Sequence, residues 1–171
     1  MNGWPHPRAR DGGTDRIPLP GPNGALWLCG KHVVGPDPVA ALARVDATTI
    51  VCLNERDELE DRYPHYVEWL RTNCDGTAVW FPIPDLHAPP LDEVRPFLDG
   101  LLRRLDDGER LLVHCGAGMG RAGTVATCLL MLLDVPRDEA LGRVAAHRPM
   151  AGPEVGAQRA LVDELATALR S

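Results

Sequence analysis

The segment Leu111–Thr124 holds the residues whose types and spacing are most suggestive of chemistry. An apolar run ends at Cys115, five residues follow, and then come Arg121 and a helical pattern. Cys115 is the only one of the five cysteines with an arginine six positions later. Three glycines fill the interval, namely Gly116, Gly118 and Gly120. A thiol and a guanidinium joined by a glycine-rich turn are typical of an anion-binding loop with a nucleophile at its base.

The glycines let consecutive backbone N–H groups turn toward one point, and the N-terminus of the next helix adds the positive end of its dipole. A tetrahedral dianion such as phosphate fits this arrangement. Arg121 would close the ring, because its planar guanidinium donates to two phosphate oxygens at once. The same field favours the thiolate of Cys115, held in line beneath the phosphorus. The predicted substrate-binding residues are Gly116, Ala117, Gly118, Met119, Gly120 and Arg121.

The elements that must position this loop are predicted from the apolar pattern. Short apolar runs predict four strands, at residues 25–29, 49–53, 78–83 and 111–115. The clearest helix has a stripe of Val94, Leu98, Leu101, Leu102 and Leu105. Further helices are expected at residues 38–45, 58–71, 123–133, 136–147 and 154–169. Strands that alternate with helices predict an α/β fold with a short, mostly parallel central sheet flanked by helices.

The length of 171 residues predicts a single domain. Residues 1–24 are rich in proline and glycine and have almost no apolar periodicity, so we expect an irregular N-terminal arm there. The domain itself is then expected over residues 25–171.

Charge and composition exclude several classes of protein. Acidic residues outnumber basic ones by 24 to 18, and the net charge of −6 argues against a nucleic-acid binder. No apolar run is long enough for membrane insertion, and the N-terminus lacks the apolar stretch of a signal peptide, so we expect a cytoplasmic protein. The five cysteines show no Cys-x-x-Cys pair, which argues against a zinc site or a disulfide framework. We predict no metal and no organic cofactor.

With this context, the segment resembles the signature loop of the cysteine-based protein tyrosine and dual-specificity phosphatases, His-Cys-x5-Arg. The matching residues are His114, Cys115, Gly118, Gly120, Arg121 and Gly123. The resemblance extends more weakly over residues 25–169, including the turn Asn54-Glu55-Arg56. It implies a phosphatase domain in which Cys115 attacks phosphorus and water hydrolyses the phosphocysteine. Because 17 of the 18 basic residues are arginine, we expect a GC-rich genome and therefore a bacterial member.

The resemblance also implies a general acid on a separate loop. Asp85 lies in Phe81-Pro-Ile-Pro-Asp-Leu86, just after a predicted strand and thirty residues before Cys115. This segment is similar to the general-acid loop of compact dual-specificity members. Asp92 is the nearest rival acid, and we interpret it as the cap of the helix that begins beside it.

The sequence departs from the family pattern after the arginine. The family has Ser or Thr there, whose hydroxyl stabilises the departing thiolate, whereas this chain has Ala122. The hydroxyl of Thr124 is a possible substitute two residues later. In many members a glutamine positions the hydrolytic water, and Glu154 or Gln158 would serve here. We expect His114 to orient the loop through backbone hydrogen bonds rather than to act as an acid or base.

These residues predict hydrolysis of phosphate monoesters, with Cys115, Arg121 and Asp85 as the catalytic residues. The expected substrates are phosphotyrosine or phosphoserine/threonine proteins. One alternative is a catalytically weak binding module for phosphorylated partners, because Ala122 removes a catalytic hydroxyl. Another is a phosphatase for a non-protein phosphoester such as a phosphoinositide or nucleotide. Relatives that accept phosphoinositides tend to carry Lys in the loop, which holds Gly, Ala and Met here.

Overall fold

The computed structural model describes residues 7–171, and all structural statements below concern that part of the chain. Its strands are β1 (Thr14–Ile17), β2 (Ala25–Gly30), β3 (Thr49–Cys52), β4 (Ala78–Trp80) and β5 (Arg110–Cys115). The short helices before β4 are α1 (Pro7–Asp11), α2 (Lys31–Val34), α3 (Pro38–Arg44), the 3-10 turn η1 (Arg56–Glu58) and α4 (Pro64–Thr72). The later helices are α5 (Leu91–Asp106), α6 (Gly120–Leu132), α7 (Arg137–His147) and α8 (Ala157–Leu169).

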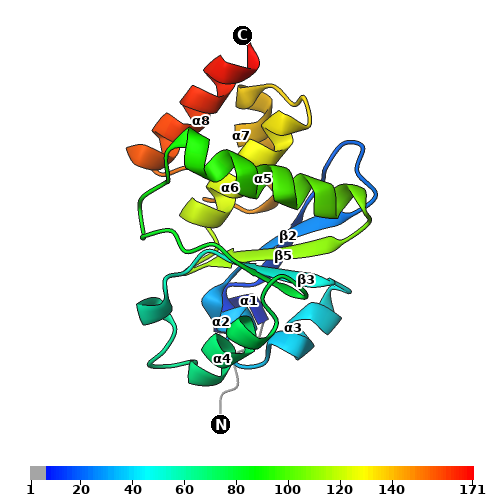
Figure 1. The fold of residues 1–171 in the computed structure, drawn as a ribbon, viewed down its shortest axis with the longest axis vertical. Helices are drawn as coiled ribbons and strands as arrows, with labels where there is room; N and C mark the ends of the chain where they lie inside the picture. The colour runs from blue at the N-terminus through cyan, green and yellow to red at the C-terminus, as the bar shows by residue number, and fades with distance from the viewer. Residues whose placement is uncertain (1–6) are drawn as a thin grey trace.

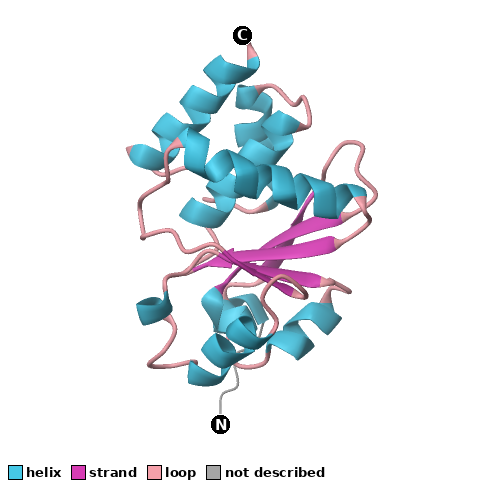
Figure 2. Cartoon of the chain, viewed as in Figure 1, coloured by secondary structure: helices cyan, strands magenta, loops and turns pink. Residues whose placement is uncertain are grey.

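The strands form one sheet in the order β1-β2-β5-β3-β4, in which β1 is antiparallel to β2 and the other pairs are parallel. Helices α5 to α8 cover one face, and α1 to α4 lie on the other (Figure 1). Figure 2 shows the sheet as the middle layer between these two groups of helices. The structure therefore confirms the predicted single α/β domain with a mostly parallel central sheet.

The central strand β5 has apolar side chains on both faces of the sheet, so helices must cover both faces. Leu111 and Val113 are buried in the core beneath α5 to α8, whereas Leu112 is buried in the second core with α2 to α4. Side chains of a strand alternate between the two faces, so a strand that is buried on both faces is apolar throughout. This pattern fixes β5 in the middle of the sheet, and its carboxyl end leads directly into the predicted anion loop.

The predicted irregular arm differs from the structure over residues 7–17. Thr14–Ile17 pairs with β2 as an edge strand, with Ile17 opposite Leu26 and fully buried. A strand of four residues with one buried side chain is too short to show a recognisable alternation of apolar and polar residues. The prolines and glycines on either side also favour an irregular structure over a strand in a sequence-based prediction. Residues 1–6 of the predicted arm lie outside the described residues.

Other element boundaries shifted for local reasons. The helix predicted at residues 58–71 is a 3-10 turn followed by α4, which begins at Pro64 because proline fits the first helical position. The strand predicted at residues 78–83 ends at Trp80, before Pro82 and Pro84. Helix α6 begins at Gly120 rather than residue 123, which places Arg121 in its first turn.

Within residues 7–171, no helix combines the length and apolarity needed to cross a membrane. The same part of the chain holds no group of three or more His, Cys, Asp or Glu side chains placed to bind a metal ion.

Candidate active site

The carboxyl end of β5 opens into a hollow of about 670 Å³ between the anion loop and the two groups of helices. Cys115 is the last residue of the strand, is almost fully buried and lines the hollow. Residues from several separate segments line the hollow together with the loop, among them Lys31, Glu58, Asp85, Arg121 and Glu154. The structure thus brings together Cys115, Arg121 and Asp85, which the sequence analysis singled out.

The loop carbonyls point outward because each has a donor outside the loop. The Lys31 N–H donates to the Gly116 carbonyl at 3.0 Å. The guanidinium of Arg148 donates to the carbonyls of Ala117 at 2.9 Å and Gly118 at 2.8 Å. In a trans peptide the N–H points opposite to the C=O, so the amides of residues 117–119 face the hollow. This is the arrangement that binds a tetrahedral anion.

Gly118 occupies the loop position at which only glycine fits. Its φ of +74° lies in the left-handed region, and an added Cβ would stand 2.3 Å from the carbonyl oxygen of Cys29. Both facts exclude a side chain there. Gly116 has neither restriction, since a Cβ would meet only an Arg121 nitrogen at 3.5 Å.

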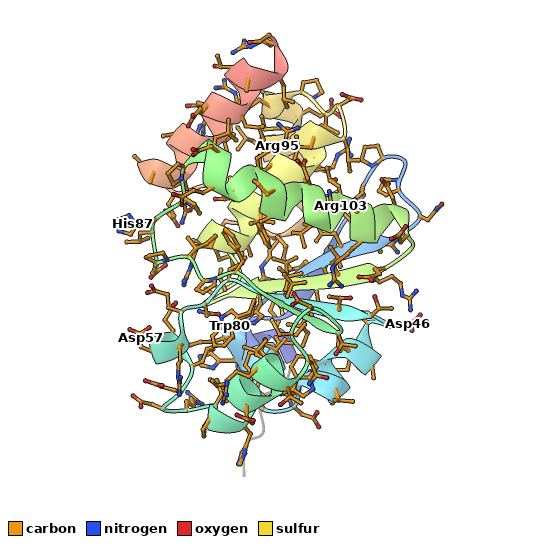
Figure 3. The ribbon with its side chains drawn as sticks, in the orientation of Figure 1. Asp46, Asp57, Trp80, His87, Arg95 and Arg103 are labelled. Atoms are coloured by element: carbon orange, nitrogen blue, oxygen red, sulfur yellow. The ribbon has the colours of Figure 1, made fainter. Side chains whose placement is uncertain are left out.

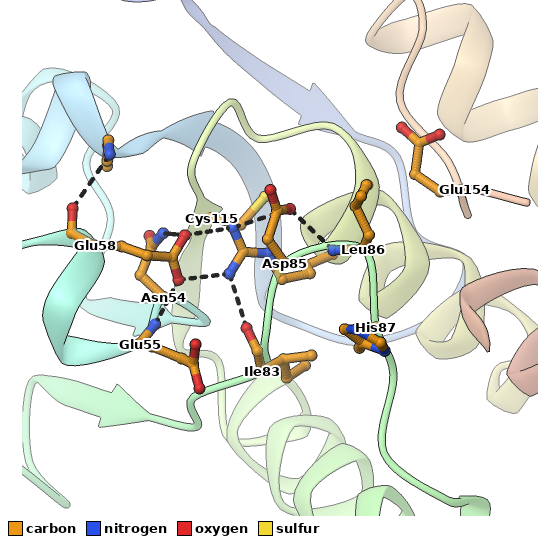
Figure 4. A network of polar contacts seen from close by, with 12 residues as sticks. Asn54, Glu55, Glu58, Ile83, Asp85, Leu86, His87, Cys115 and Glu154 are labelled. Carbon is orange, nitrogen blue, oxygen red and sulfur yellow. Dashed lines mark hydrogen bonds and ion pairs between the residues drawn. The ribbon is translucent and has the colours of Figure 1, made fainter. Parts of the chain in front are cut away.

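Arg121 is buried, with 3% of its surface exposed, and its guanidinium has a complete set of protein partners except at one atom. Its two terminal nitrogens each donate to a carboxylate oxygen of Glu58 at 2.8 Å, and Nη1 also donates to the Ile83 carbonyl at 2.8 Å (Figure 4). The buried Nε has no hydrogen-bond partner among the described residues. A buried unpaired donor calls for an explanation, and an anion held in the adjacent loop supplies one.

Glu58 is a functional residue that the sequence analysis missed. It accepts from the Glu55 N–H at 2.7 Å and from Asn54 Nδ2 at 3.0 Å, in addition to Arg121. Burial alone would raise the pKa of Glu58, but the hydrogen bonds from Arg121 and the Glu55 N–H outweigh it and hold the pKa below its ordinary value. The ionised carboxylate therefore fixes the plane of the guanidinium. The only sequence signal was the neighbouring Asn54-Glu55-Arg56 turn.

Asp85 lies at the rim, on the loop between β4 and α5. Its Oδ1 is 3.4 Å from Arg121 Nη2 and accepts from the Leu86 N–H at 3.0 Å, while 71% of the side chain is exposed. An exposed carboxyl above the arginine can reach a leaving group that enters from solvent. Asp92 lies in the first turn of α5 instead, and the predicted cap is wrong because Pro90 is the N-cap residue and no side chain caps it.

The segment that carries Asp85, residues 81–90 between β4 and α5, is also held near its two ends. Figure 3 shows His87 on the outer side of this loop, with Trp80 at the end of β4. The Trp80 indole donates to the Asn54 carbonyl at 2.8 Å, and the His87 carbonyl accepts from Gln158 Nε2 at 3.3 Å. These hydrogen bonds link the two ends of this segment to the turn after β3 and to α8.

His114 is completely buried beneath the loop. Its Nε2 lies 2.6 Å from the Tyr66 hydroxyl, and its Nδ1 lies 3.3 Å from the Cys115 carbonyl. Burial lowers the pKa of His114 to about 4, so the imidazole is neutral at pH 7. The neutral imidazole thus contacts one side chain, Tyr66, besides the backbone contact to Cys115 that the sequence analysis expects.

Thr124 and Gln158 hold the site together in ways that the sequence did not predict. The Thr124 hydroxyl donates to the Gly120 carbonyl at 2.7 Å rather than to the sulfur of Cys115. Gln158 Oε1 accepts from the Glu154 N–H at 2.9 Å and contacts the Thr124 hydroxyl at 3.3 Å. Both ends of the Gln158 amide thus serve as structural links, and Glu154 rather than Gln158 lines the hollow.

Known structures with the same fold include several phosphatases. The chain is similar to Tk-PTP in its active form, with 26% identity and a TM-score of 0.67 over 96% of this chain and 99% of that chain. It is also similar to kinase associated phosphatase with its catalytic-site cysteine replaced by serine, with 21% identity and a TM-score of 0.70 over 86% and 88% of the two chains. PTPMT1 in complex with PI(5)P shares 14% identity, with a TM-score of 0.66 over 92% and 96%.

A family model gives the assignment. The model described as PTP-SAK, a Swiss Army Knife protein, DSP-PTPase phosphatase domain, matches residues 27–164. This range includes the loop after β5, Glu58, Asp85 and Arg148, which is nearly the whole site. The protein therefore belongs to the DSP-PTPase family of phosphatase domains.

Proposed function

We propose that this phosphatase hydrolyses phosphate monoesters through a phosphocysteine on Cys115, with His-Cys-x5-Arg as its signature loop. The observation that carries the proposal is the convergence at one strand end of a thiol, inward-facing amides and an arginine with one unpaired buried donor. Phosphate is the ligand that satisfies these groups together, since it offers several acceptor oxygens around one electrophilic atom.

The first step forms the bond between sulfur and phosphorus. The Cys115 thiolate attacks phosphorus, the P–O bond to the leaving group breaks, and Asp85 donates its proton to the departing oxygen. The amides of residues 116–121 and Arg121 stabilise the charge on the equatorial oxygens. In the second step water attacks the phosphocysteine, gives a proton to Asp85, and the P–S bond breaks to restore the thiolate.

The substrate that we propose is a phosphorylated protein side chain, phosphotyrosine or phosphoserine/threonine. The hollow is open enough for a side chain of another protein, with Asp85 exposed at its rim, and the loop has no lysine for additional phosphates. A panel of phosphopeptides, nucleotides and vesicles with PI(5)P, the ligand in the PTPMT1 structure, separates the substrate classes.

One observation favours a slower second step, and hence the alternative of a weakly catalytic binding module. Ala122 is completely buried and has no hydroxyl, and the Thr124 hydroxyl is engaged by Gly120. The thiolate that leaves the phosphocysteine therefore lacks the hydroxyl donor that Ser or Thr would provide at position 122.

The mechanism is tested with an aryl phosphate and the purified protein. Cys115→Ser should abolish turnover but retain binding of orthovanadate, because the amides and Arg121 remain. Arg121→Lys should lower kcat/KM at least about 100-fold, since an ammonium cannot span two phosphoryl oxygens. Cys74→Ser is the matched control, because Cys74 is an exposed cysteine that does not line the hollow. Turnover by Cys115→Ser at the wild-type rate contradicts the proposal.

A further inference from the structure

Arg148 is the largest completely buried side chain of the described residues, and it lies on the outer side of the anion loop. It follows α7 directly. As described above, its Nε and Nη2 donate to the carbonyls of Gly118 and Ala117. Its remaining nitrogen, Nη1, donates to the Gly13 carbonyl at 3.2 Å and to Asp15 Oδ2 at 2.7 Å. One guanidinium therefore joins the loop to the start of the chain.

Asp15 supplies the negative charge in this arrangement. It lies on β1, opposite Leu28 of β2, and only 14% of its side chain is exposed. A guanidinium with no exposed surface needs a carboxylate partner, because a buried unpaired charge costs several kcal/mol. Arg8 also contacts Asp15, but from the solvent side, with 47% of its side chain exposed. Asp15 is thus the carboxylate that balances the charge of Arg148 and holds its guanidinium in place.

The peptide geometry carries this restraint to the site. The two carbonyls that Arg148 holds belong to the peptide groups whose N–H donors are those of Gly118 and Met119. Because C=O and N–H of one peptide are antiparallel, outward carbonyls aim these two donors at the hollow. Without Arg148 the glycines of the loop would let the peptides rotate, since glycine imposes little restriction on φ and ψ.

We propose that Asp15 and Arg148 form a clamp that positions the anion loop, so that strand β1 supports the site from outside the hollow. Both residues act through the loop peptides and are positioning residues, not catalytic ones. The proposal rests on the proposed function, because it assigns the clamp to phosphate binding at Cys115.

The test measures orthovanadate affinity and kcat/KM for an aryl phosphate in Asp15→Asn, Arg148→Lys and the double variant. Each single variant should weaken vanadate binding and lower kcat/KM about tenfold or more, or about 1.4 kcal/mol. The double variant should lose little more than either single variant, because the two residues act as one unit. Asp15→Glu keeps the charge and should recover part of the loss. Asp163→Asn is the matched control, since it breaks the 2.6 Å ion pair with Arg137, which lies away from the hollow.

Vanadate affinity, measured beside thermal unfolding, separates the clamp from a general loss of stability. Folded Asp15→Asn and Arg148→Lys proteins with affinities within about twofold of wild type would overturn the clamp. If Asp15→Asn does not fold, Arg148→Lys decides alone, because lysine still pairs with Asp15 but cannot hold two carbonyls. Failure of the wild type to hydrolyse any phosphate monoester would instead contradict the proposed function.

Discussion

Replacing Glu58 with glutamine tests whether the paired carboxylate sets the geometry of Arg121. The substitution keeps the size of the side chain but removes its charge. A glutamine can offer only one acceptor oxygen to the two nitrogens that now donate to Glu58 at 2.8 Å. Its amide nitrogen would instead face a guanidinium N–H, which forces Arg121 to turn.

The size of the effect follows from the two bonds and their burial. A hydrogen bond to a charged group contributes about 1.5–3 kcal/mol, and removing one partner of a buried ion pair costs about 3–5 kcal/mol. Arg121 is 3% exposed but Glu58 is 21% exposed, so water reduces the penalty. We expect a loss of about 2–3 kcal/mol of transition-state stabilisation, or about 30- to 150-fold in kcat/KM.

The assay is steady-state hydrolysis of an aryl phosphate, together with thermal unfolding. Glu60→Gln is the matched control, because Glu60 forms a 2.9 Å ion pair with Arg56 that is largely exposed. Exposed pairs contribute about 0–1 kcal/mol, so kcat/KM should be unchanged. If Glu58→Gln keeps kcat/KM within about threefold of wild type while Arg121→Lys does not, Glu58 does not orient the guanidinium.

Four further outcomes are expected. Asp85→Ala should lower kcat most for alkyl or phenyl phosphates and least for esters with an acidic leaving group, because only a poor leaving group needs the proton; an equal loss for all esters would make Asp85 structural. Gly118→Ala should reduce kcat/KM at least about 100-fold and Gly116→Ala less than about tenfold, since only the first Cβ collides with a backbone carbonyl. Ala122→Ser should raise steady-state kcat about tenfold and remove the burst of leaving group that we expect from the wild type in stopped flow, because a charge-assisted hydrogen bond to sulfur contributes about 1.5–3 kcal/mol. His114 has a pKa of about 4 when folded and an ordinary value of 6.5, so the unfolded chain binds its proton first as the pH falls. The neutral His114 side chain therefore contributes fully to stability above the unfolded pKa, and this contribution declines below it. Between about pH 7 and about pH 5, urea unfolding should show that the free energy of unfolding of the wild type falls by about 2 kcal/mol more than that of His114→Gln.

The sequence predicted the parts of this protein that depend on local pattern. The strand into Cys115, the glycine loop and the helix after it form one continuous segment, and each has its own periodicity or composition. Asp85 could be found because prolines mark its loop and a family resemblance gives the spacing. Apart from the family spacing, these signals lie within a few residues of the site residues themselves.

The parts that sequence could not predict are contacts between distant segments. Glu58 and Arg121 are 63 positions apart, and Asp15 and Arg148 are 133 positions apart. Arginine and acidic residues are common in this chain, so no spacing identifies which of them will be buried together. The Thr124 hydroxyl turned to Gly120 because a backbone carbonyl one helical turn away is its nearest acceptor.

The spread of the site along the chain makes enzyme activity a measure of the whole fold. Hydrogen bonds around the loop connect Gly13, Glu58, Ile83 and Arg148, which come from both ends and the middle of the sequence. A partly folded chain that keeps only β5 and α6 has the thiol and the arginine but none of the groups that orient them. Loss of turnover in denaturant should therefore coincide with loss of secondary structure, and turnover can serve as a sensitive assay of complete refolding.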